Sequence, residues 1–259
     1  MSYIHKTAII EEGATIGNNV HIGPFVTISS QATIGDDTTI DAHAVIDGKT
    51  TIGKGNHIFS HAVVGSIPQD LKFNGEEVEL IIGDNNKIRE FTLLNPGTKG
   101  GGSVTKIGNN NLLMGYVHLG HDVIMGNNCI LANGATLAGH VELGDNVVIG
   151  GLTPVHQFVH IGDFAMIAGA SALSQDIPPY CLAEGNRATL RGLNLTGLRR
   201  GLPREAVNEL KIAYKELFES GQALQEIANN LYQNSSSEHV KKLAEFITKS
   251  KRGIPYTRK

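Results

Sequence analysis

Four histidines lie between positions 118 and 156, and one of them, His121, is followed directly by Asp122. A neutral imidazole can accept a proton near physiological pH, and an adjacent carboxylate can hold it in one tautomer. The other three histidines of this segment are His118, His140 and His156. A single histidine among eleven is usually only a solvated side chain. The prediction of a site therefore depends on whether these residues meet in space.

A six-residue repeat decides which residues meet. Aliphatic residues recur at every sixth position from Ile4 to Val64, eleven times in all. The period resumes at Ile82 for three repeats, slips by one residue, and runs twelve more times from Ile107 to Leu173. Such a repeat predicts one short strand and one turn per six residues, with three repeats closing a triangular coil around inward aliphatic side chains.

We therefore expect an all-β left-handed parallel β-helix over residues 1–185. The left hand is taken from known hexapeptide-repeat proteins, because parallel crossovers are otherwise right-handed. Pairs such as Gly35-Asp36 recur between the strands and predict left-handed φ values at the corners. Two segments, about 66–80 and 95–106, break the period and should leave the coil as loops, where substrate contacts tend to concentrate.

The period ends after about Pro178, and residues 186–259 should form a connector and a small α-helical domain. Apolar spacing predicts helices at about 203–219, 222–233 and 237–251. The segment leading into them, from residue 180, has no periodic pattern. We expect these helices to cap one end of the prism.

Stacking gives a test of which polar residues converge. Three repeats make one coil, so residues eighteen apart lie above one another, about one strand spacing apart. His121, Gly139 and Gln157 then form one column, and Asp122 and His140 belong to the next. A potential base, a carboxylate, a backbone free of side chains and a second imidazole should therefore lie together.

Composition excludes several classes of protein. The net charge of −3 argues against a nucleic-acid binder, which normally has a basic excess. No stretch approaches the roughly 18 apolar residues of a membrane span, and no basic segment followed by an apolar one indicates a secretory signal. Cys129 and Cys181 cannot form a disulfide framework. We expect a cytoplasmic protein.

A zinc site is the competing interpretation of the histidines, because zinc needs three or four converging ligands. His118 and His121 are three apart on a strand-and-turn repeat, which sends their rings to different places on the coil. Asp122 is better placed to orient His121 than to bind an ion. We therefore expect no metal. A structural β-helix and an acyltransferase using acetyl-CoA remain as alternative functions.

Four motifs carry a family resemblance. The segment VHLGHDVIMGNNCILANGATLAGHVELGDNVVIGGLTPVHQF, with IPQDLKF before it and PPYCLAEGN and GLNLTGLRRG after it, resembles the bacterial UDP-N-acetylglucosamine acyltransferases. These enzymes catalyse the first step of lipid A synthesis. The resemblance covers the whole chain. It implies transfer of a 3-hydroxyacyl chain from acyl carrier protein to the 3-position of UDP-N-acetylglucosamine or of its 3-amino analogue.

The resemblance also implies roles for particular residues. His121 matches the general base, Asp122 the group that fixes its tautomer, and Gly139 the backbone amide at the thioester oxyanion. The positions that match substrate-binding residues are Gln69, Asp70, Lys72, His118, His140, His156, Gln157, Asn194, Arg199 and Arg200. No cofactor is implied beyond the phosphopantetheine of the carrier protein. The family forms homotrimers with each site between two subunits.

Three positions depart from the family pattern. Asn95 replaces a histidine, Thr196 occupies a position that is often acidic, and the Arg199-Arg200 run is one residue short. Asn95 favours a 3-amino sugar, because an amine needs no prior deprotonation; alternatively, it only shapes a turn before Pro96. The acyl chain length is not predicted.

A basic stretch predicts where the carrier protein docks. Residues 187–204 contain five arginines and no acidic residue, and five more cations lie in or just after the last helix. Such a run is often only a solvated face. Because acyl carrier protein is acidic, we expect these cations to steer it to one end of the prism.

Overall fold

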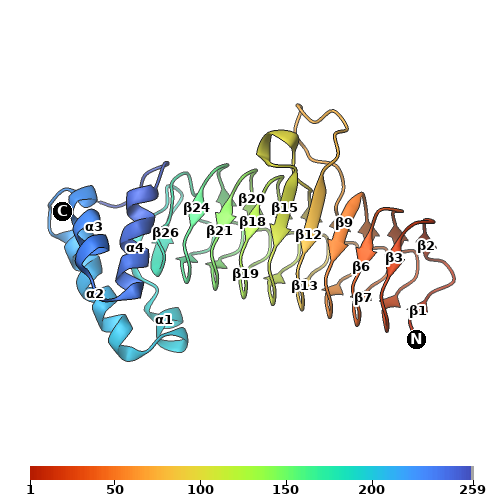
Figure 1. Cartoon of the computed structure of the whole chain (residues 1–259), viewed down its shortest axis with the longest axis horizontal. Coiled ribbons are helices and arrows are strands. Elements are labelled where there is room, and N and C mark those ends of the chain that lie inside the picture. Colours follow the sequence, from red (N-terminus) through yellow and green to blue (C-terminus); the bar gives the residue numbers. More distant parts are fainter. Residues whose placement is uncertain (258–259) are drawn as a thin grey trace.

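The computed structural model describes residues 1–257 and shows a triangular prism with a helical domain at one end (Figure 1). Each side of the prism is a sheet of short parallel strands. The first sheet contains β1 (Tyr3–Ile4), β4 (His21–Ile22), β7 (Thr39–Ile40), β10 (His57–Ile58), β13 (Lys87–Ile88), β16 (Leu112–Leu113), β19 (Ile130–Leu131), β22 (Val148–Ile149), β25 (Met166–Ile167), β26 (Cys181–Glu184) and β27 (Thr189–Leu193).

The other two sheets have eight strands each. The second sheet contains β2 (Ile9–Ile10), β5 (Thr27–Ile28), β8 (Val45–Ile46), β11 (Val63–Val64), β14 (Leu93–Leu94), β17 (His118–Leu119), β20 (Thr136–Leu137) and β23 (Pro154–Val155). The third sheet contains β3 (Thr15–Ile16), β6 (Thr33–Ile34), β9 (Lys49–Ile52), β12 (Glu79–Ile82), β15 (Val104–Ile107), β18 (Ile124–Met125), β21 (Glu142–Leu143) and β24 (His160–Ile161).

The aliphatic residue of each repeat points into the prism, as the period predicts. Ile22, Ile40 and Ile58 are 0% exposed, and they stack in register from β4 through β7 to β10. Burying one such side chain stabilises the fold by about 1.5–3 kcal/mol, so each coil adds its own share of core. The predicted left-handed parallel β-helix is confirmed.

The corners are built differently from the expectation. In the Gly35-Asp36 pair the left-handed residue is the one that follows, Asp37, with φ 58°. Glycine is needed at position 35 because a Cβ there would lie 2.5 Å from the carbonyl carbon of Gly53 in the next coil. The predicted left-handed φ at the corners is confirmed, but it falls on the residue after the pair, and the glycines of these pairs serve the close stacking of coils.

Two loops leave the prism on the same side (Figure 1). Ile82 pairs with Ile52 although they are thirty residues apart, so the first loop adds twelve residues to its coil. The expected ranges, 66–80 and 95–106, were too long at their ends. Because β12 and β15 are four-residue strands that pair with each other, the first loop ends at residue 78 and the second at 103.

The helical domain has four helices, α1 (Leu195–Gly201), α2 (Arg204–Glu219), α3 (Leu224–Asn234) and α4 (Glu238–Lys249). The last three match the predicted helices to within two residues at each end. No helix or strand was predicted within the connector, but β26 and β27 form an antiparallel hairpin there that extends the first sheet, and α1 follows directly. No helix in residues 1–257 is long and apolar enough to cross a membrane.

Candidate active site

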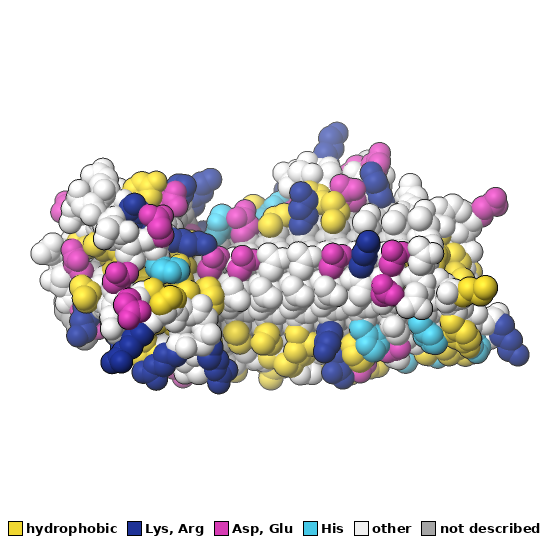
Figure 2. Space-filling view, turned by 60° about the horizontal axis from the view of Figure 1, so that its bottom comes forward, with side chains coloured by type: hydrophobic (Ala, Val, Ile, Leu, Met, Phe, Trp, Pro, Cys, Tyr) yellow, Lys and Arg dark blue, Asp and Glu magenta, His cyan; other side chains and the backbone are white. Residues whose placement is uncertain are grey.

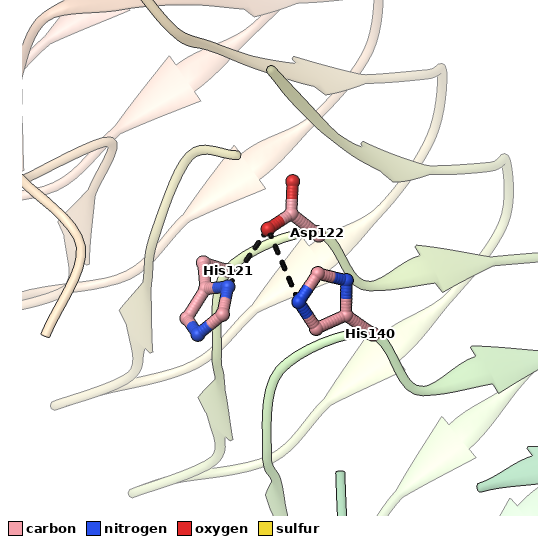
Figure 3. Close-up of side chains that lie close together, drawn as sticks. All are labelled: His121, Asp122 and His140. Atoms are coloured by element: carbon pink, nitrogen blue, oxygen red, sulfur yellow. Dashed lines mark hydrogen bonds and ion pairs between the residues drawn. The ribbon is translucent and has the colours of Figure 1, made fainter. Parts of the chain in front are cut away.

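His121 and Asp122 lie at the corner between β17 and β18 (Figure 3). His121 Nδ1 is 2.7 Å from Asp122 Oδ2, and the side chains are 18% and 1% exposed. A carboxylate can only accept, so Nδ1 carries the proton and Nε2 keeps a free lone pair. This is the arrangement of an imidazole held ready to take a proton.

The buried carboxylate of Asp122 is fully hydrogen-bonded by the second loop. Thr98 donates its backbone N–H to Oδ1 at 2.8 Å and its hydroxyl to Oδ2 at 2.6 Å. The backbone N–H of Asp122 donates to Thr105 Oγ1 at 2.8 Å. Gly101 packs against the carboxyl group, since a Cβ at that position would lie 2.0 Å from Asp122 Cγ. These partners offset the cost of burying a charge.

Thr98, Gly101 and Thr105 were not predicted as site residues. The local signal was the run of three glycines from Gly100 to Gly102, in a loop already expected to carry function. Nothing in that run indicates which residue contacts Asp122.

Two further imidazoles lie near the pair, one on β17 of the same coil and one in the next coil. His140 Nε2 is 3.8 Å from Asp122 Oδ2 (Figure 3). The His140 ring stacks on Phe158, with ring centroids 4.3 Å apart. His118 Nδ1 is 3.1 Å from the carbonyl oxygen of Leu93. Burial lowers the pKa of both His118 and His140, more than the nearby acceptors raise it. Both rings are therefore neutral hydrogen-bonding groups at pH 7.

Gly139 lies directly against the ring of His121, as the column predicts. A Cβ at this position would lie 2.5 Å from His121 Cε1 and 2.6 Å from Nε2. The Gly139 N–H donates to no acceptor among the described residues. A backbone donor and the free lone pair of His121 thus lie side by side, which suits a reaction that removes a proton and develops negative charge on an oxygen.

A cleft of about 790 Å³ opens between the two loops and the neighbouring corners that carry His140 and Phe158. Its lining includes Asp70 and Lys72 from the first loop, Lys99 from the second, and His140 with Phe158 from the coils. His156 and Gln157 follow β23, and both are exposed. Gln69 is exposed on the first loop but does not line the cleft.

The three groups His121 Nδ1, Asp122 Oδ2 and His140 Nε2 lie within 4.8 Å of one another, a spacing that metal ligands can have. Asp122 Oδ2 already accepts the His121 N–H and the Thr98 hydroxyl. Because these hydrogen bonds stabilise the carboxylate without an ion, the geometry favours a hydrogen-bonded His–Asp pair over a metal site.

Comparison with known proteins identifies the family. A family model described as Udp N-acetylglucosamine O-acyltransferase, Domain 2, matches residues 176–255. Another, described as Bacterial transferase hexapeptide (six repeats), matches residues 1–30 and 105–139. The chain is 75% identical over 259 residues to the acyl-[acyl-carrier-protein]–UDP-N-acetylglucosamine O-acyltransferase of Sulfurovum sp., with 100% of both chains covered. The chain belongs to the UDP-N-acetylglucosamine O-acyltransferase family.

Two further relatives agree with this assignment. The enzyme of the same description from Aliarcobacter butzleri is 67% identical over 100% of both chains. The solved UDP-N-acetylglucosamine acyltransferase from Campylobacter jejuni is 52% identical, has a TM-score of 0.95, and matches 98% of this chain and 100% of its own. The resemblance predicted from the four sequence motifs is therefore confirmed.

Three of the predicted substrate-binding residues, Asn194, Arg199 and Arg200, lie apart from the His–Asp pair, at the N-cap and within α1 at the helical end. Asn194 Oδ1 accepts the backbone N–H of Gly197 and so caps α1, while its Nδ2 donates to the carbonyl oxygen of Phe164. Arg199 lines a separate hollow, and Arg200 is exposed. Within one chain, the structure does not bring these residues to the cleft.

Asn95 does not face the cleft, although it was expected near the sugar. It is 1% exposed, and its Nδ2 donates to the carbonyl oxygens of Ser66 and Ile67 at 2.9 and 3.2 Å. Its Oδ1 is buried with no partner among the described residues. Asn95 therefore ties the second loop to the start of the first.

Proposed function

We propose that this protein transfers a 3-hydroxyacyl chain from acyl carrier protein to the 3-position of UDP-N-acetylglucosamine, the first step of lipid A biosynthesis. The family assignment supports the substrates. The observation that supports the chemistry is the His121 ring, bonded to buried Asp122 and lying against Gly139.

In this proposal His121 Nε2 removes the proton from the attacking group of the sugar. The nucleophile attacks the thioester carbonyl, and the Gly139 N–H stabilises the resulting oxyanion. The intermediate collapses and expels the phosphopantetheine thiolate, which takes the proton from the imidazolium and leaves as the thiol. General-base catalysis contributes about 10²–10⁴-fold and one oxyanion donor about 10²–10³-fold. The acyl group arrives on the carrier's phosphopantetheine, so we propose that the enzyme needs no metal or cofactor of its own.

The acceptor and its contacts are part of the proposal. Asp70, Lys72 and His140 line the cleft and would contact the sugar. The buried amide of Asn95 gives no direct argument for a 3-amino sugar, so the acceptor remains either the 3-hydroxyl or the 3-amino form. Competition between the two UDP-sugars in one reaction decides it, with tenfold discrimination equal to about 1.4 kcal/mol.

The decisive test is turnover by the purified protein. A panel of hydroxyacyl carrier proteins with UDP-N-acetylglucosamine should give an acylated UDP-sugar, detected by mass spectrometry. No product from any donor with either sugar would refute the proposal. We also propose a cytoplasmic location, where acyl carrier protein delivers its chains.

The homotrimer is proposed on the distribution of exposed apolar side chains. The prism edge between the first and second sheets carries Phe25, Phe91, Tyr116 and Leu152, which are 48–73% exposed; we call it the apolar edge. The outward residues of the third sheet are mostly polar, as with Glu142. His43 and His61 stack between Phe25 and Phe91 on this edge. Because monomers rarely expose so many large apolar and aromatic side chains along one edge, the apolar edge suits packing against two further copies.

Light scattering should give three times the chain mass of 27.7 kDa. Leu152→Glu on the apolar edge should dissociate the trimer, whereas Thr51→Glu on the third sheet should not. An active wild-type monomer at working concentration would refute the arrangement.

Docking of the carrier protein is proposed at a basic hollow of about 440 Å³, lined by Arg199, Arg204 and Lys211. None of the three forms an ion pair with the described residues. Figure 2 shows Lys and Arg side chains gathered at this end of the molecule. The acidic carrier protein should bind here by electrostatic attraction, which salt screens. Its affinity should fall as salt rises and fall further in Lys211→Glu; affinity independent of salt would contradict the proposal.

A further inference from the structure

The segment Asn95–Thr98 contacts both the first loop and the His–Asp pair. Asn95, at one end, donates hydrogen bonds to the carbonyl oxygens of Ser66 and Ile67. Thr98, at the other end, donates two hydrogen bonds to the carboxylate of Asp122. Thr98 also lines the cleft, and the segment links the loop that carries Asp70 to the His–Asp pair.

The two hydrogen bonds from Thr98 are directed at different oxygens. Its backbone N–H reaches Oδ1 at 2.8 Å, and its hydroxyl reaches Oδ2 at 2.6 Å. Thr98 and Asp122 are 5% and 4% exposed, so water does not replace either bond. Oδ2 is also the atom that accepts the His121 Nδ1–H at 2.7 Å. The hydroxyl and the imidazole therefore share one oxygen.

We propose that Thr98 is a positioning residue for the acyl transfer: its hydroxyl fixes the Asp122 carboxylate so that His121 keeps Nε2 beside Gly139. This inference rests on the proposed function. Two donors on two oxygens prevent the carboxyl group from rotating about its Cβ–Cγ bond. The hydroxyl also shares the negative charge that would otherwise be directed at His121 alone.

Thr98→Val and Thr98→Ser separate these effects. Both keep the backbone N–H bond, and valine has nearly the shape of threonine, so the loop should stay in place. Valine removes the hydroxyl donor, whereas serine retains it. Thr51→Val is the matched control, because Thr51 is an exposed threonine of β9 on the third sheet.

We expect Thr98→Val to lower kcat by roughly tenfold to a hundredfold, the usual effect of a small misplacement of a catalytic group. The KM values should stay within about twofold, because Thr98 positions the base more than the substrate. Thr98→Ser should recover most of the loss. Wild-type kcat in Thr98→Val, or serine no better than valine, would overturn the inference.

The pH profile distinguishes positioning from a purely structural role. Without the hydroxyl, Asp122 directs more of its charge at His121, so the acidic limb of kcat/KM should move to higher pH in Thr98→Val and stay at the wild-type position in Thr98→Ser. The titratable groups that face the pair from the neighbouring coils and loops are unchanged: His118, His140, Asp70, Lys72, Glu76 and Lys99. A limb that does not move upward would contradict the proposal.

A second measurement needs no turnover. Carbethoxylation attacks only the neutral imidazole, and mass spectrometry resolves its rate at His121 as a function of pH. The titration of that rate should move upward in Thr98→Val, whatever the substrate of the protein is. An inactive wild type would thus refute the proposed function, whereas an unmoved titration would refute the role of Thr98.

Discussion

Gly139→Ala should inactivate the enzyme by displacing His121. The added Cβ would lie 2.5 Å from Cε1 and 2.6 Å from Nε2 of that ring. Gly139 does not have a left-handed φ, so alanine causes no backbone strain. The backbone N–H also remains available to an oxyanion. The three atoms nearest to the added Cβ all belong to the imidazole of His121, so this ring must move.

The expected loss of activity follows from how far the His121 ring is displaced. Carbon atoms in contact lie about 3.5–4.0 Å apart, so the ring must move by roughly 1 Å. Such a shift cannot preserve the 2.7 Å bond from His121 Nδ1 to Asp122. A 1 Å misplacement of a catalytic group costs about 10²-fold in rate, which equals about 2.7 kcal/mol in the transition state.

The assay is kcat/KM for acyl transfer, with the unfolding temperature as a check on the fold. Gly115→Ala is the matched control, because its added Cβ meets first the amide nitrogen of Asn133 at 3.2 Å, the end of a side chain that can swing away. This control should keep its activity. A Gly139→Ala enzyme that retains a third or more of the wild-type rate would refute the reasoning.

Three further predictions concern the histidines and the thiols. His121→Ala should lower kcat by about 10²–10⁴-fold with the fold intact, and a variant that keeps more than about a tenth of the rate would contradict general-base catalysis. Burial lowers the pKa of His118 in the folded state, so the unfolded chain binds a proton at this residue first and stability falls as pH drops below about 6.5. In scanning calorimetry, the melting temperature of His118→Gln should therefore fall less between about pH 7 and pH 5 than that of the wild type or of His156→Gln. Burial raises the pKa of the Cys129 thiol to about 12, and Cys181 is 0% exposed, so Ellman's reagent should react with neither until the protein unfolds.

The amino-acid sequence by itself determined the coil and the meeting of His121 with Gly139. The spacing of six sets three strands per coil, and eighteen residues later the chain returns to the same edge. The structure has this register, with His118 beside Thr136 in adjacent strands. Local arithmetic suffices here because every coil pairs only with its neighbours. The three long C-terminal helices could also be predicted from the sequence, since the spacing of their apolar residues and the helix-ending residues beside them are local signals.

Only the tertiary structure decided how the pair is held. Thr98 reaches Asp122 across twenty-four residues, from a loop that has no period to fix its path. The same is true of Asn95, which was expected at the sugar and instead ties the two loops together. The hairpin of β26 and β27 was hidden because its strands add to an existing sheet edge and not to a repeat. A periodic segment is specified by its own spacing, whereas an aperiodic loop takes its conformation from the contacts it finds on the folded prism.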